Sequence, residues 1–314
     1  MPEHDQLHRE HQYDGGGYNP AFDAEAGSHD AEVEATADHD AGCFVPTLPP
    51  RLQARAAELA ARINRVNAPL TQGAMPEGGP VVAFLSVLTS KYWGQQRRTL
   101  TVSFMEATPN DLKQRILSHM NAWNIGVRFA LTTGTGQVRI SRSGQGYWSY
   151  LGTDILLIPQ NKPTMNLQGF TMNTAESEYK RVVRHETGHT LGFPHEHLRQ
   201  ALVNRLDVAK TIAYFRNTYG WSEQQTRSNV LTPIAENLLR GTSPDQDSIM
   251  CYQLPAQITK DGQPIRGGLD INATDRTFAR SIYPPLFILQ AFEPVSWDEA
   301  DDVSLDEALV LANV

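Results

Sequence analysis

The chain has 314 residues, of which 40% are hydrophobic, enough to bury the core of one large or two modest domains. Its only cysteines are Cys43 and Cys251, which excludes a fold built on a disulfide framework. No run approaches the ~20 apolar residues that a bilayer-spanning helix needs. The first 30 residues lack the basic start and apolar stretch of a secretory signal. We therefore expect no membrane span and synthesis in the cytoplasm, with any export using a non-classical route.

The net charge of −8 is unevenly distributed along the chain. Residues 1–42 contain eleven acidic residues and one arginine, a net charge of −10, and residues 285–314 contain seven acidic residues and no base. This composition predicts a disordered acidic tail at each end. The middle of the chain is basic by comparison, and its field favours acidic peptides or the chain's own tails.

Between the tails, the sequence predicts a segment at 43–80 and a catalytic body at 81–284. Pro49-Pro50 opens a helical stretch that continues to about residue 67, and the Gly/Pro-rich residues 71–80 indicate a linker. Within the body, alternating apolar residues predict a strand at 99–104. A helix is expected at 109–123, with Leu112, Ile116 and Met120 on its apolar face.

Further strands are expected at 127–131, 137–141, 154–158 and 165–170. A helix at 179–190 is followed by mostly irregular chain, with two later helices near 208–217 and 273–282. Strands and helices thus come first, which predicts an α+β fold with an irregular second half.

The most informative stretch is HETGHTLGFPHEH, which starts at residue 185. His185 and His189 are four residues apart, so on a helix they lie one turn apart on one face and can bind the same ion. Gly192 can take a positive φ and end the helix, which brings His195 round as a third ligand. Three imidazoles leave a fourth position open, as in catalytic rather than structural zinc sites. Glu186 lies where it can act as general base on a zinc-activated water.

We do not expect His197, two residues beyond the third ligand, to bind the metal. In an extended chain it faces away from the metal, so we expect a surface residue or a neighbour of the ligands, and not a ligand.

These residues resemble the astacin family of the metzincin zinc peptidases. The third histidine is followed by Glu196 and Arg199, and residues 248–252, SIMCY, resemble the family's Met-turn. Residues 144–152, GQGYWSYLG, and the segment LDINATD at 269–275 also resemble astacin segments. The resemblance covers about residues 90–284.

The resemblance implies a zincin-like α+β fold divided by the active-site cleft. A twisted, mostly parallel sheet, a backing helix and the active-site helix would lie above the cleft, and an irregular subdomain below it. It implies one Zn²⁺ per chain, held by His185, His189 and His195, with Tyr252 as an additional ligand that swings away to stabilise the transition state. Met250 would form the apolar floor beneath the metal. Trp148 and Tyr150 are equally compatible with a cleft wall and with the core.

The sequence departs from the family at Tyr147 and Cys251, which replace residues that are commonly Cys and His. Astacins are often kept silent by an amino-terminal segment that places an Asp or a Cys on the zinc. In this chain Cys43, Asp40 and Asp38 are candidates for that role, and a thiolate is a good zinc ligand. An idle buried cysteine is the alternative for Cys43.

The sequence thus predicts a monomeric zinc endopeptidase that acts on peptides or proteins and binds no nucleic acid. A serralysin-like protease is an alternative, although it would have Pro in place of Glu196 and calcium-binding glycine repeats. A catalytically silent zinc-stabilised binding module is a second alternative, and it would be expected to have lost Glu186 or a ligand.

Overall fold

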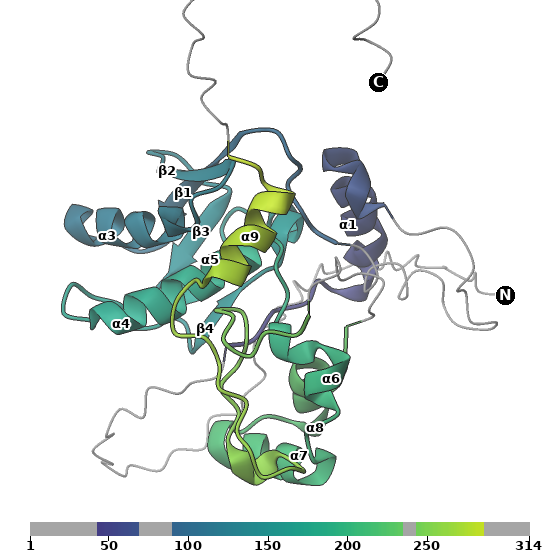
Figure 1. Ribbon diagram of the computed structural model, residues 1–314. Coiled ribbons are helices and arrows are strands. Elements are labelled where there is room, and N and C mark those ends of the chain that lie inside the picture. Colours follow the sequence, from purple (N-terminus) through teal and green to yellow (C-terminus); the bar gives the residue numbers. More distant parts are fainter. Residues whose placement is uncertain (1–42, 69–89, 235–242, 286–314) are drawn as a thin grey trace, which may run out of the picture.

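The computed structural model describes residues 43–68, 90–234 and 243–285 (Figure 1). The predicted acidic tail at 1–42 and the linker at 71–80 lie outside these residues. So does the acidic tail beyond Pro285, while the predicted start of the body near residue 81 falls in the second gap. None of the helices in the described ranges is long and apolar enough to cross a membrane.

A five-stranded mixed sheet forms the upper half of the molecule. Its strands lie in the order β2-β1-β3-β5-β4. The first four of these run parallel, and β4 runs antiparallel to β5 at the edge. Every residue of the central strand β3 is buried, as expected for a parallel sheet covered on both faces. The strands are β1 (Arg98–Phe104), β2 (Val127–Leu131), β3 (Val138–Ser141), β4 (Tyr147–Ser149) and β5 (Met165–Leu167).

Helices pack on this sheet. The backing helix α3 (Asn110–Met120) buries Leu112, Ile116 and Met120, the apolar face that the sequence predicts. The active-site helix consists of α4 (Glu176–Glu178), a π-type stretch (Tyr179–Val183) and α5 (Arg184–Thr190). The last helix, α9 (Ala273–Ile282), crosses in front of α5 in Figure 1. This arrangement confirms the predicted α+β, zincin-like fold.

The lower half has short helices joined by irregular chain: α6 (Gln200–Val203), α7 (Val208–Tyr219) and α8 (Glu223–Thr226). It has a hydrophobic cluster of its own, which includes Leu206, Phe215, Val230, Leu254 and Ile265. The sequence places this change of architecture correctly, just after the helix that carries the zinc motif.

One predicted strand is wrong. The sequence predicts an extended segment at 154–158, but Gly152–Leu157 forms a 3-10 helix. The chain is held against an earlier segment here, because the Thr153 amide donates to the Lys91 carbonyl at 3.0 Å. Gly152 has φ +47°, and a Cβ there would lie only 1.9 Å from the Lys91 oxygen. A contact with a residue some sixty positions earlier therefore fixes this turn, and the local pattern of apolar residues does not reveal it.

The amino-terminal helix α1 (Pro50–Ile63) lies beside the body and contacts the 3-10 helix at Gly152–Leu157. Its fully buried residues are three alanines, Ala56, Ala57 and Ala60, so it packs closely but buries little apolar surface. Ahead of the helix, Phe44 forms an isolated parallel bridge with Trp148 of β4. Residues 43–67, which we call the amino-terminal strap, thus reach from the edge strand to the far end of α1.

Candidate metal centre

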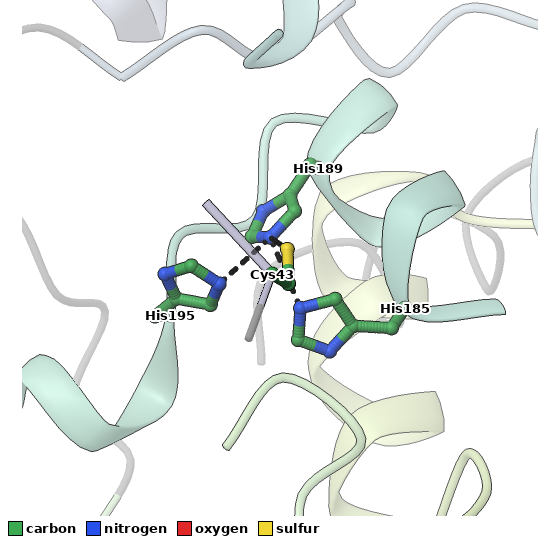
Figure 2. A group of neighbouring side chains, drawn as sticks. All are labelled: Cys43, His185, His189 and His195. Carbon is green, nitrogen blue, oxygen red and sulfur yellow. Dashed lines mark hydrogen bonds between the residues drawn. The ribbon is translucent and has the colours of Figure 1, made fainter. Parts of the chain in front are cut away.

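The end of the active-site helix places the three motif histidines. Gly192 has φ +94°, and its amide donates to the His189 carbonyl at 2.8 Å, which closes the helix after α5. The chain then reverses, and the Phe193 amide donates to the Gly188 carbonyl at 2.9 Å. This turn brings His195 back toward His185 and His189, as Figure 2 shows.

The Nε2 atoms of the three histidines face one another. His189 Nε2 lies 3.1 Å from His185 Nε2 and 3.0 Å from His195 Nε2. On the opposite side of two rings, His185 Nδ1 donates to the Ile249 carbonyl at 2.6 Å and His189 Nδ1 donates to the Phe193 carbonyl at 2.8 Å. With the proton on Nδ1, the Nε2 lone pairs point at a common place.

The three histidines are neutral. All three are buried, and burial lowers the pKa of His185 to about 4 and holds those of His189 and His195 well below the ordinary value. Neutral imidazoles with their lone pairs about 3 Å apart repel one another unless a cation lies between them. The arrangement therefore fits a metal ion.

Cys43 completes the group as a fourth ligand atom (Figure 2). The four atoms lie within 4.8 Å of one another, and the thiol sulfur is 3.5 Å from His189 Nε2. With Zn–N of about 2.0–2.1 Å and Zn–S of about 2.3 Å, a tetrahedral site separates two nitrogens by about 3.3 Å and nitrogen from sulfur by about 3.6 Å. The three separations that involve His189 Nε2, 3.0, 3.1 and 3.5 Å, are close to these values.

The charge of the Cys43 thiol also depends on such an ion. Burial and the neighbouring Glu186 carboxylate raise the pKa of this thiol well above its ordinary value. A thiolate at this position therefore requires a cation beside it, which zinc would supply.

Glu186 is buried next to the histidines on α5. Its Oε2 atom has no hydrogen-bond partner within the described ranges, and burial raises the pKa of its carboxyl to about 8. A carboxylate that is poorly solvated and free to accept a proton has the properties of a general base near neutral pH.

Met250 packs directly under the active-site helix. A Cβ built on Gly188 would lie 2.3 Å from the Met250 sulfur and 3.1 Å from the Trp123 ring, so the helix backbone rests on these two side chains. The Met250 carbonyl accepts the Glu196 amide at 2.8 Å, which ties this turn to the segment after the third histidine. Met250 thus packs against the helix that carries His185 and His189.

Tyr252 lies beside His195, with ring centroids 4.3 Å apart. Its hydroxyl is buried and, apart from the Cys43 thiol, has no hydrogen-bond partner among the residues that the structure describes. Burial, together with the Cys43 and Glu186 groups, raises the pKa of the phenol well above its ordinary value, so it is a protonated donor. In this structure the thiol of Cys43 lies at the histidines, with Tyr252 next to it.

Of the two positions expected for His197, on the surface or beside the ligands, the structure rules out the first. This residue does not lie on the surface, because the 3-10 turn at Glu196–Leu198 rotates it into the interior, where it is fully buried. Its ring stacks on Tyr252 with centroids 4.2 Å apart and planes 11° apart. An extended-chain assumption hid this contact, and no pattern in the sequence signals the turn.

A cleft runs past the site below the edge strand. The Phe44 amide donates to the Tyr147 carbonyl of β4 at 3.3 Å, and the Phe44 ring packs on Trp148 at 6.1 Å. Trp148 and Tyr150 are half-buried and contact each other, and Tyr150 packs against the hydrophobic core. The adjacent pocket is lined by Tyr147, Arg181, Glu186, Tyr214, Tyr219 and Tyr252, among others.

The chain was compared with protein families, curated proteins and solved structures. No family model and no curated protein matches the chain. A solved structure of myroilysin matches with 28% identity over 63% of this chain and 97% of its own, with a TM-score of 0.58. A second myroilysin structure has 26% identity, 77% and 100% coverage and a TM-score of 0.49. High choriolytic enzyme 1, a hatching-enzyme zinc protease from the medaka fish Oryzias latipes, has 22% identity, 59% and 88% coverage and a TM-score of 0.41.

Myroilysin is an astacin-family zinc metalloprotease. Of these three matches, the first myroilysin structure alone has a TM-score above 0.5. The fold, the spacing of the zinc motif and this match agree. The chain is an astacin-like zinc metallopeptidase.

In this astacin-like enzyme, a second pocket lies behind the third histidine. It is lined by Glu196, Arg199, Asp245 and Asp275 above an apolar floor. Burial raises the pKa of Glu196 to about 7, and its Oε1 accepts the Asp245 amide at 3.2 Å. Sequence reasoning singled out Glu196 from the family pattern but gave no reason to expect the acidic residues that surround it.

Proposed function

We propose that the chain is a zinc-dependent endopeptidase in which Glu186 is the general base. The observation that carries this proposal is the convergence of three neutral imidazoles, with His189 Nε2 about 3 Å from the Nε2 atoms of the other two, beside a buried carboxyl whose Oε2 has no partner among the described residues. One Zn²⁺ per chain would be held by His185, His189 and His195. When bound, zinc supplies Lewis acidity, which acidifies water and polarises a peptide carbonyl.

The chain's own residues would carry out the proton transfers. Glu186 takes a proton from the attacking water and delivers it to the departing amine. Tyr252 then donates a hydrogen bond to the oxyanion that develops. Apart from the Cys43 thiol, its hydroxyl has no hydrogen-bond partner among the described residues, so removal of that thiol leaves the donor available.

The substrate would be an extended peptide that lies along the edge strand β4. An edge strand offers unpaired backbone groups to a further chain. Phe44 pairs with this edge in the present structure, so its neighbourhood accepts an extended segment.

We also propose that Cys43 keeps the enzyme latent. Its thiol lies where the fourth ligand of a catalytic zinc would be water or substrate, and its chain covers the edge strand. Asp38 and Asp40, the other candidates for this role, lie outside the described residues. The buried sulfur at the histidines favours Cys43.

The experiment compares zinc-loaded full-length Cys43→Ser with the same variant carrying Glu186→Ala, using casein as substrate. We expect cleavage by the first protein, loss of nearly all cleavage in the second and equal zinc content in both. A chelator should abolish the activity of the first. Cleavage at an equal rate by both would refute the role of Glu186.

The unsubstituted chain is the control for latency. It should cleave casein more slowly than Cys43→Ser at equal zinc content, and equal rates would show that the thiol is not a lock. A zinc-loaded Cys43→Ser protein that cleaves nothing would instead support the silent binding module.

A further inference from the structure

We propose that His197 is a positioning residue that holds the Tyr252 ring in the orientation needed for catalysis. This inference rests on the proposed role of Tyr252 as donor to the oxyanion. It concerns a histidine that is not one of the metal ligands.

The first observation is the stacking of the two rings. His197 and Tyr252 are nearly parallel, with centroids 4.2 Å apart, and both are buried. His195 contacts the same tyrosine at 4.3 Å with an interplanar angle of 47°. Tyr252 thus contacts two imidazoles that also contact each other, with centroids 5.0 Å apart, and of these only His195 belongs to the proposed metal site.

The second observation is that His197 is itself fixed. Its Nε2 donates to the Asn229 carbonyl at 2.9 Å, in the π-type stretch Arg227–Leu231 of the lower half. The neighbouring Val230 is fully buried, so this stretch is anchored in the lower hydrophobic cluster. The hydrogen bond to this stretch therefore holds the imidazole in place against the Tyr252 ring.

The third observation concerns the tyrosine hydroxyl. Apart from the Cys43 thiol, which the Cys43→Ser variant removes, no polar partner among the described residues directs it. Its direction depends on how the ring is packed, and His197 provides the flat surface for that packing.

A preorganised donor stabilises an oxyanion without reorientation during the reaction. Loss of one such donor costs about 10²–10³-fold in kcat. Loss of its positioning should cost less, and we expect about 10-fold or more in kcat with little change in KM, because the ground-state peptide does not use the hydroxyl.

The experiment uses the full chain with Cys43→Ser and a fluorogenic peptide. His197→Ala removes the stacking ring, His197→Leu removes it while retaining apolar volume, and His197→Phe restores a flat ring without the hydrogen bond. The inference predicts a lowered kcat for Ala and Leu and a kcat near that of the parent for Phe. It also predicts that His197→Ala causes no further loss once Tyr252→Phe is present.

The matched control is His119→Ala. His119 is also a buried imidazole that packs on a tyrosine, Tyr179, at 5.1 Å, but outside the site. This variant should lower the urea midpoint without lowering kcat, which separates lost packing from lost positioning.

A second measurement requires no activity. In the zinc-free full chain with ¹³C-labelled tyrosine, assigned by Tyr252→Phe, the Tyr252 ring resonance should be single and sharp in the parent and in His197→Phe. In His197→Ala and His197→Leu it should shift and broaden.

The possible failures are distinguishable. If Tyr252→Phe leaves kcat unchanged, the proposed role of the tyrosine is wrong. If Tyr252→Phe lowers kcat while His197→Ala and His197→Leu do not, His197 does not position the ring. If the parent cleaves no peptide, the proposed function fails, and an unchanged ring resonance in the His197 variants would refute the packing claim by itself.

Discussion

Asn67→Ala tests whether the amino-terminal strap is anchored at the end opposite Cys43. The Asn67 side chain is fully buried and makes four hydrogen bonds. Its Nδ2 donates to the carbonyls of Ala60 and Tyr92 at 2.9 and 2.7 Å. Its Oδ1 accepts the Tyr92 amide at 3.0 Å and the Ser90 hydroxyl at 2.9 Å. The amide group thus joins the strap to the body.

The free-energy cost of Asn67→Ala follows from the hydrogen bonds that the substitution removes. The three hydrogen bonds that join Asn67 to Tyr92 and Ser90 would be lost, whereas the Ala60 carbonyl keeps the Asn64 amide at 2.9 Å. At about 1 kcal/mol per hydrogen bond the loss comes to about 3 kcal/mol. This corresponds to about a 100-fold change in an equilibrium constant, since 1.4 kcal/mol is tenfold. Because α1 buries mainly three alanines, few other contacts would compensate.

The assay is alkylation of cysteines in the zinc-free full chain, followed by peptide-resolved mass spectrometry. If Asn67 anchors the strap, Asn67→Ala should raise the rate at Cys43 by about 100-fold and leave the rate at the buried Cys251 little changed. Asn121→Ala is the control, since Asn121 also bonds with both side-chain atoms, to Leu117 and Phe129, but lies within the body. An unchanged Cys43 rate in Asn67→Ala would refute the reasoning.

Three further predictions concern the body. Gly188→Ala should lower the free energy of unfolding by about 1–3 kcal/mol, because its Cβ would lie 2.3 Å from the Met250 sulfur. The control is Gly134→Ala, whose Cβ would meet nothing within 4 Å and which should leave the free energy of unfolding unchanged. Equal urea midpoints for the two variants would contradict this. Burial lowers the pKa of His119, so His119 should cost stability as the pH falls through its unfolded pKa of about 6.5. The urea midpoint of His119→Gln should therefore fall less between pH 7 and pH 5.5 than that of the wild type. An equal fall of the midpoint in both proteins would contradict this. Zinc at about 100 times its dissociation constant should stabilise the chain by about 2.7 kcal/mol in urea unfolding, and a midpoint indifferent to zinc would mean that the folded site does not bind it.

The parts of the fold that follow local rules could be predicted from the sequence. Alternating apolar residues located β1 and β2, and a helical face of Leu112, Ile116 and Met120 located α3. The metal ligands could be identified because their spacing along one helix, and the glycine that ends it, are local features.

The remaining features depend on contacts between distant residues. The turn at Gly152 exists because Lys91 lies against it, and the burial of His197 follows from a 3-10 turn and from Asn229, over thirty residues later. Cys43 reaches His189 across 146 positions. Family resemblance could therefore suggest its place at the metal, whereas spacing along the chain could not.

Zinc-edge X-ray absorption of the purified full chain tests the central claim most directly. We predict one zinc per chain with three nitrogen ligands at about 2.0–2.1 Å and one sulfur at about 2.3 Å, and in Cys43→Ser the loss of the sulfur with the three nitrogens retained. A zinc shell without three imidazole nitrogens, or no bound zinc, would contradict the convergence of His185, His189 and His195 on one ion.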